Sequence, residues 1–124
     1  MRVLLLWLAM LCACDGSISR EGIVIDAHTK QPIAGAQIWF ADRVYNDELK
    51  SYLDGKSTTL EDPDATSAAD GTFLVKERLA GPGGHEVWMV VRSDGYTEDK
   101  RQIWKGTGLK GAGPKVEVAL VKSP

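Results

Sequence analysis

Short apolar runs, separated by clusters of Gly, Pro, Asp and Ser, make up most of the chain after residue 20. In the strongest run, 86–92, aliphatic side chains occupy every second position, as in a strand with one buried face. An Asp-Gly pair at 70–71 is a typical hairpin signal. The pattern therefore predicts an all-β sandwich. Its strands are expected at 22–26, 36–41, 72–76, 86–92, 101–104 and 115–121.

One segment, 42–66, is longer than a hairpin connection should be, and such segments often carry structure or function of their own. Asn46 is placed to cap a short helix over 47–53. The apolar side chains of this helix would share one face: Leu49, Tyr52 and Leu53. A helix this short is marginal alone in water, so we expect it to dock on another part of the fold.

Four motifs follow one another in a recognisable order. They are Gly-Ile-Val-Ile-Asp at 22–26, Pro-Ile-Ala-Gly-Ala at 32–36, Asp-Gly-Thr-Phe at 70–73 and Asp-Gly-Tyr at 94–96. This order resembles the carboxypeptidase regulatory-like domain, one of the transthyretin-like (prealbumin-like) β-sandwiches. The resemblance covers most of 21–121 and leaves 42–66 as an insertion. It implies a single Greek-key sandwich of about seven strands over 21–124, with an accessory or binding role and no catalytic residues.

The first fourteen residues have the pattern of an export signal. A positive start at Arg2 precedes an apolar run over 3–11, and a small residue, Ala13, precedes Cys14. The run is well short of the roughly 20 apolar residues that span a bilayer. The segment 11–14, Leu-Cys-Ala-Cys, resembles the lipobox of bacterial lipoproteins. That resemblance implies removal of a signal peptide, 1–13, and a diacylglyceryl and N-acyl modification of Cys14. The alternative is an ordinary secretory signal with an incidental cysteine.

The same resemblance gives an expected location. Several acyl chains on one residue would anchor the protein stably to a membrane of the cell envelope. Asp15 resembles the signal that retains such lipoproteins at the inner membrane, although outer-membrane sorting is the alternative. Residues 14–20 would then be the lipidated cysteine and a polar tether for a periplasm-facing domain. The expected partners are the membrane and an envelope protein or glycan.

Charge and cysteine content narrow the function further. The formal net charge is −2 and becomes −3 without Arg2. This argues against a nucleic-acid partner, because such domains carry a basic patch. The only two cysteines, Cys12 and Cys14, would be lost or acylated, which leaves no thiol for a disulfide, a metal or a nucleophile. We expect no cofactor.

Residues for catalysis or metal binding are few. His28 and His85 are the only histidines, and both are expected to be solvent-exposed. A small periplasmic hydrolase that uses one of them is the alternative to a non-catalytic binding or structural module. The acidic cluster over 61–70 shows no calcium-loop spacing and is expected to be solvated: Glu61, Asp62, Asp64 and Asp70. The motif of the related hydroxyisourate hydrolases and the Lys–Asn crosslink of collagen-adhesin B-type domains are both missing from the sequence.

Three tryptophans give the sharpest candidate site. Trp39, Trp88 and Trp104 each alternate with aliphatic residues in predicted strands, so all three are expected on the outer face of one sheet. Exposed together, they would form an unusually large apolar patch. In one interpretation the helix 47–53 covers the indoles. In the other they stay open and bind a sugar or a protein partner.

Overall fold

A computed structural model of the chain describes residues 16–79, 83–107 and 111–124. Within these ranges it contains seven strands and one helix. In chain order they are β1 (Ser17–Asp26), β2 (Gln37–Asp42), α2 (Asp47–Leu53), β3 (Ala65–Thr66), β4 (Thr72–Arg78), β5 (His85–Arg92), β6 (Asp99–Gly106) and β7 (Val116–Leu120).

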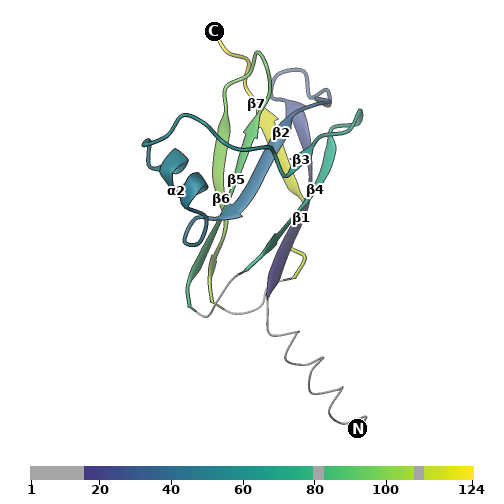
Figure 1. Ribbon diagram of the computed structural model, residues 1–124. Coiled ribbons are helices and arrows are strands. Elements are labelled where there is room, and N and C mark those ends of the chain that lie inside the picture. The colour runs from purple at the N-terminus through teal and green to yellow at the C-terminus, as the bar shows by residue number, and fades with distance from the viewer. Residues whose placement is uncertain (1–15, 80–82, 108–110) are drawn as a thin grey trace, which may run out of the picture.

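The strands form two sheets that face each other (Figure 1). One sheet has the order β4-β1-β7, and the other has the order β3-β2-β5-β6. All strand pairs are antiparallel except β1 with β7, which is parallel. The all-β sandwich predicted from the sequence is therefore confirmed, and its seven described strands agree with the number that the family resemblance implied.

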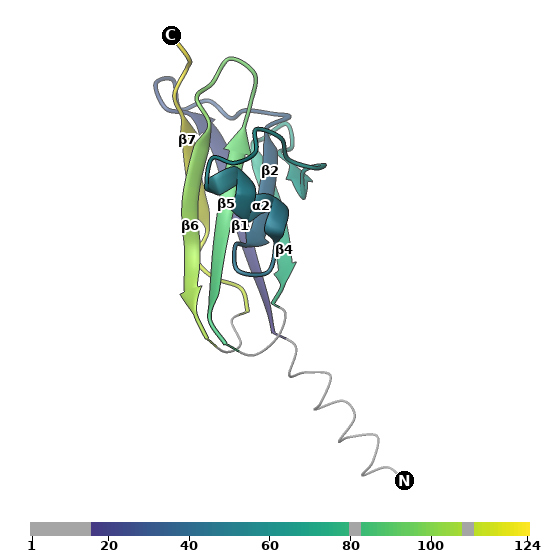
Figure 2. The ribbon, with the colours of Figure 1, turned by 60° about the vertical axis from the view of Figure 1, so that its left-hand side comes forward.

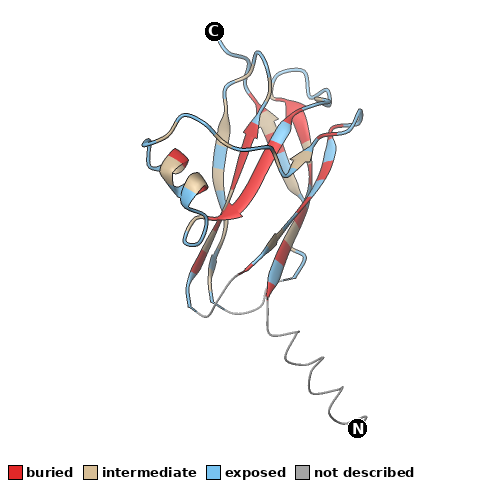
Figure 3. Ribbon diagram, in the orientation of Figure 1, coloured by how far each residue is buried: buried red, intermediate tan, exposed pale blue. Residues whose placement is uncertain are grey.

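The core lies between the sheets and follows the predicted alternation (Figure 3). Ile38 and Phe40 of β2 face Val24 of β1 across it, and all three are fully buried. Gly22 is required where β1 passes under the Phe73 ring, because a Cβ there would lie 2.4 Å from Phe73 Cζ. The hairpin motif 70–73 thus places its aromatic residue in the core.

The start of β1 differs from the prediction. The strand begins at Ser17, and the carbonyl of the buried Gly16 accepts a hydrogen bond from Leu79 N at 2.8 Å. Residues 17–20 are therefore part of the sheet, not a tether. The apolar pattern did not predict a strand over 17–20, because the charged Arg20 occupies a core-facing position and is only 4% exposed. Its burial lowers the pKa of the guanidinium.

Helix α2 has the predicted bounds and the predicted cap. The side-chain oxygen of Asn46 accepts a hydrogen bond from Leu49 N at 2.9 Å, which satisfies an amide that the first turn leaves free. The helix lies against the outer face of the β3-β2-β5-β6 sheet (Figure 2). The insertion also contributes β3, a two-residue edge strand that pairs with β2 and that the sequence did not indicate.

The sandwich has two distinct ends (Figures 1 and 2). We call the end where β1 begins the base; there Ser17 pairs with Arg78. We call the opposite end the crown; it holds the turn 93–96 and the C-terminal segment, where Ser123 N donates to Gly95 O at 2.9 Å.

The predicted signal peptide, 1–13, and the candidate lipid and sorting residues, Cys14 and Asp15, lie outside the described residues. Among the described residues, no helix has both the length and the apolar character needed to cross a bilayer.

Candidate functional site

A cleft of about 720 Å³ opens at the crown, on the outer side of β2 and β5. Its walls are the insertion segment 60–63 and the turn 92–96, and its floor includes Gln37 and Trp39. Antiparallel pairing of β2 with β5 sets Gln37 directly beside Arg92. The cleft therefore joins residues from three distant parts of the chain.

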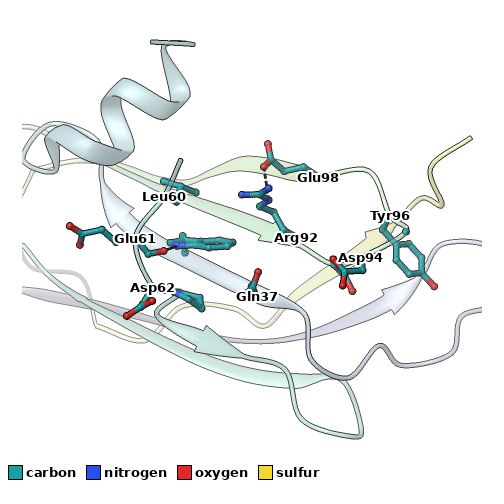
Figure 4. Close-up of a pocket in the computed structure, with 12 residues that line it drawn as sticks. Gln37, Leu60, Glu61, Asp62, Arg92, Asp94, Tyr96 and Glu98 are labelled. Atoms are coloured by element: carbon teal, nitrogen blue, oxygen red, sulfur yellow. Dashed lines mark hydrogen bonds and ion pairs between the residues drawn. The ribbon is translucent and has the colours of Figure 1, made fainter. Parts of the chain in front are cut away.

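Arg92 lies in the middle of the cleft (Figure 4). Its Nε lies 3.5 Å from Glu98 Oε2, and its guanidinium lies 5.7 Å from the centre of the Trp39 ring. A cation over an indole face is attracted by the negative face of the ring. Arg92 is thus held from two sides while its side chain stays 45% exposed.

Glu98 connects the cleft to helix α2. Besides Arg92, its carboxylate accepts a hydrogen bond from Tyr52 Oη and lies 3.4 Å from Lys100 Nζ. Burial and, next, the hydrogen bond to Glu98 raise the pKa of Tyr52 to about 12. The tyrosine therefore stays a neutral donor at physiological pH and fixes one wall of the cleft to the helix.

The wall of the cleft formed by the segment 60–63, across from Glu98, is acidic. Glu61 and Asp62 lie at this side of the cleft (Figure 4), and Trp39 Nε1 donates to the Glu61 carbonyl at 2.8 Å. A hydrogen bond to Glu48 and repulsion from that carboxylate raise the pKa of Glu61. Within the described ranges, the side chains of Gln37, Asp62 and Asp94 make no hydrogen bond or ion pair. These polar groups are therefore available to a ligand.

Two of the three tryptophans lie where the sequence placed them, and they are covered. Trp39 and Trp88 occupy the outer face of the sheet and pack with the helix. Leu49 and Tyr52 of α2 are buried against them, and Trp39 is only 8% exposed. Of the two interpretations, the structure has the one in which the helix covers the indoles.

The prediction that Trp104 shares that face is wrong. Val87 pairs with Trp104 but Trp88 pairs with Gln102, so β6 has one extra residue, Ile103, at this point. Such a bulge breaks the alternation of side chains between faces. Both Ile103 and Trp104 consequently pack against the main core, on the side opposite to Trp39.

The expectation of two exposed histidines is right for His28 and wrong for His85, which is 3% exposed. His85 Nδ1 lies 2.5 Å from Asp42 Oδ2, between the rings of Tyr45 and Trp104. The other oxygen of Asp42 accepts the amides of Val44 and Glu86. Because Asp42 joins the end of β2 to the start of β5, we assign this pair a structural role.

The acidic residues predicted to form a solvated cluster over 61–70 have different environments in the structure. Asp64 accepts a hydrogen bond from Phe40 N at 2.6 Å, but its burial outweighs the effect of that bond and raises its pKa. Asp70 accepts hydrogen bonds from the amide and hydroxyl of Thr72, which lower its pKa. Among the residues that the structure describes, no group of His, Cys, Asp or Glu side chains is arranged to hold a metal ion.

Sequence reasoning missed the central residues of the cleft, Gln37, Arg92 and Glu98. Each is a common surface residue with no motif around it, and only the pairing of β2 with β5 brings the first two together. The turn motif at 94–96 was the one available signal, since it marks the end of β5.

The sequence matches no protein-family model and no curated protein. Solved structures are similar in fold. 3-Chlorocatechol 1,2-dioxygenase from Rhodococcus opacus 1CP has a TM-score of 0.52 and 13% identity, over 88% of this chain and 60% of that chain. GBS52, a minor pilin of Streptococcus agalactiae, has a TM-score of 0.42 and 14% identity, over 90% of this chain and 46% of that one. The dioxygenase likeness supports the sandwich fold and carries no activity over.

Proposed function

We propose that this protein is a non-catalytic binding module of the carboxypeptidase regulatory-like type, anchored to a bacterial envelope membrane through acylated Cys14. The sequence 11–14 supports the anchor, and Asp15 favours the periplasmic side of the inner membrane. The order of its four motifs and the sandwich fold support the family.

The crown cleft is the proposed binding site. The observation that carries this proposal is its group of unpaired polar side chains around a fixed arginine, in a hollow of about 720 Å³. Ligand sites combine a concave shape with a few convergent polar groups. The ligand is a polar surface of an envelope protein or a glycan. The covered indoles Trp39 and Trp88 serve as the floor and support of the cleft, not as an open stacking surface.

A pull-down from envelope extract with the acylated protein tests the site. Arg92→Ala removes the central cation and is expected to abolish capture of the partner. Arg101→Ala is the matched control, because Arg101 pairs with Asp99 of the same strand, β6, and lies outside the cleft. Equal capture by both variants, with both folded, would exclude the crown cleft as the binding site.

A second experiment tests the anchor. Cys14→Ala is expected to move the protein from the membrane fraction to the soluble fraction, since the acyl chains can no longer be attached. A variant that remains with the membranes would contradict the lipid anchor without affecting the proposal for the cleft.

A further inference from the structure

The distance between the proposed lipid and the folded domain is very short. Gly16 is already part of the fold, because it is buried and its carbonyl accepts the Leu79 amide. Only Asp15 separates Gly16 from Cys14. Consecutive Cα atoms lie about 3.8 Å apart, so the Cα atoms of Cys14 and Gly16 are at most about 8 Å apart. A lipid on Cys14 would therefore hold the base within contact distance of the headgroups.

The crown cleft lies toward the opposite end of the sandwich, on the outer face of the β3-β2-β5-β6 sheet. β1 runs for ten residues from the base to Asp26, and a strand rises about 3.3 Å per residue, so it spans about 30 Å. At its far end, Tyr96 Oη donates to Asp26 Oδ2 at 2.8 Å, which ties the turn 93–96 to the end of β1. Arg92 of the cleft is the last residue of β5, which runs for eight residues from His85 near the base, so the sandwich fixes the height of the cleft above the base.

We propose that the sandwich stands end-on on the membrane, with its base against the lipid headgroups and the crown cleft turned away from the bilayer. The inference rests on the proposed acylation of Cys14. It also restricts the ligand of the cleft. A site held roughly 20 Å above the headgroups meets molecules of the aqueous compartment, or tall envelope proteins, and not the lipids of its own membrane.

Short-range quenching in vesicles tests this orientation. The acylated mature protein, which begins at Cys14, is reconstituted in phosphatidylcholine–phosphatidylglycerol vesicles that contain a headgroup-linked nitroxide quencher. A fluorophore is attached through Thr107→Cys, near the base, or through Thr97→Cys, at the crown; both residues are exposed. The label at position 107 is expected to be quenched several-fold more strongly than the label at position 97.

A spacer variant serves as the control. An insertion of about 15 Gly and Ser residues between Asp15 and Gly16 would give the domain about 20 Å of flexible reach. We expect it to remove most of the difference between the two labels.

Three results would overturn the proposal. Equal quenching of the two labels without the spacer would mean that the domain lies flat or tumbles, and stronger quenching at position 97 would mean that the crown faces the bilayer. In both cases the anchor would stand. Failure of the protein to float with the vesicles would instead refute the anchor, and the orientation with it.

Discussion

Glu77 is an acidic residue at a core-facing position, and its replacement gives the most quantitative prediction. On β4, Phe73, Val75 and Glu77 alternate toward the opposite sheet, and the last of these is half-buried. Burial, followed by repulsion from Asp64 and Asp42, raises the pKa of Glu77 to about 7. The sandwich therefore holds this carboxyl in its protonated form more firmly than the unfolded chain does.

The sign and size of the effect follow from this pKa. The unfolded value is about 4.3, so protonated Glu77 contributes stability that is fully present below about pH 4 and is lost as the pH rises through 7. The shift would be worth about 4 kcal/mol without screening. Because the side chain is half exposed, solvent screening reduces this to about 1 kcal/mol. Glu77→Gln should remove the penalty of ionisation and keep the shape.

Urea denaturation from pH 4 to pH 9, followed by tryptophan fluorescence, measures the effect. Glu77→Gln is expected to exceed the wild type in unfolding free energy by about 1 kcal/mol near pH 8 and to match it near pH 4. Glu21→Gln, at an exposed position of β1, should show no such dependence. A difference between Glu77→Gln and the wild type that is the same at all pH values, or a wild type that is more stable near pH 8, would show that ionisation of Glu77 does not destabilise the fold.

Two further substitutions test the packing by denaturation and fluorescence. Gly22→Ala places a methyl group 2.4 Å from Phe73 Cζ and should lower the unfolding free energy by about 1–3 kcal/mol. Gly84→Ala, whose methyl group meets nothing within 4 Å, should be nearly neutral, and equal effects of the two substitutions would contradict the close packing at Gly22. Leu49→Ala should lower the unfolding free energy by about 2–4 kcal/mol and shift tryptophan emission to the red, because water reaches the covered indoles. Lys50→Ala, at an exposed position of the same helix, should leave the emission unchanged. An unshifted spectrum for Leu49→Ala would mean that the helix does not cover the indoles.

Features that depend on neighbouring residues could be predicted from the sequence. The cap of α2 joins Asn46 to Leu49, three positions away, so residue type and spacing were enough to locate the helix. The hairpin at 70–73 is equally local. The alternation of apolar and polar residues along the strands identified the sandwich, because each strand of a sandwich buries one face. The alternation in the strongest strand, β5, agrees with the burial of Val87, Met89 and Val91.

Features that depend on strand register could not be predicted. The extra residue in β6 reverses the face of Trp104, and nothing in the local composition marks it. The sequence around His85 predicts a surface residue. In the structure, the end of β2 places Asp42, 43 positions away in sequence, beside it. The crown cleft has the same origin, because Gln37 and Arg92 become neighbours only through pairing of their strands.

The proposed lipid attaches the folded sandwich to a membrane through Cys14 with almost no intervening chain. Intact-mass and peptide mass spectrometry of the protein extracted from membranes can detect this attachment. The mature chain is expected to begin at Cys14 and to carry the mass of a diacylglyceryl group and an N-acyl chain. A chain that begins at another residue, or an unmodified Cys14, would contradict it.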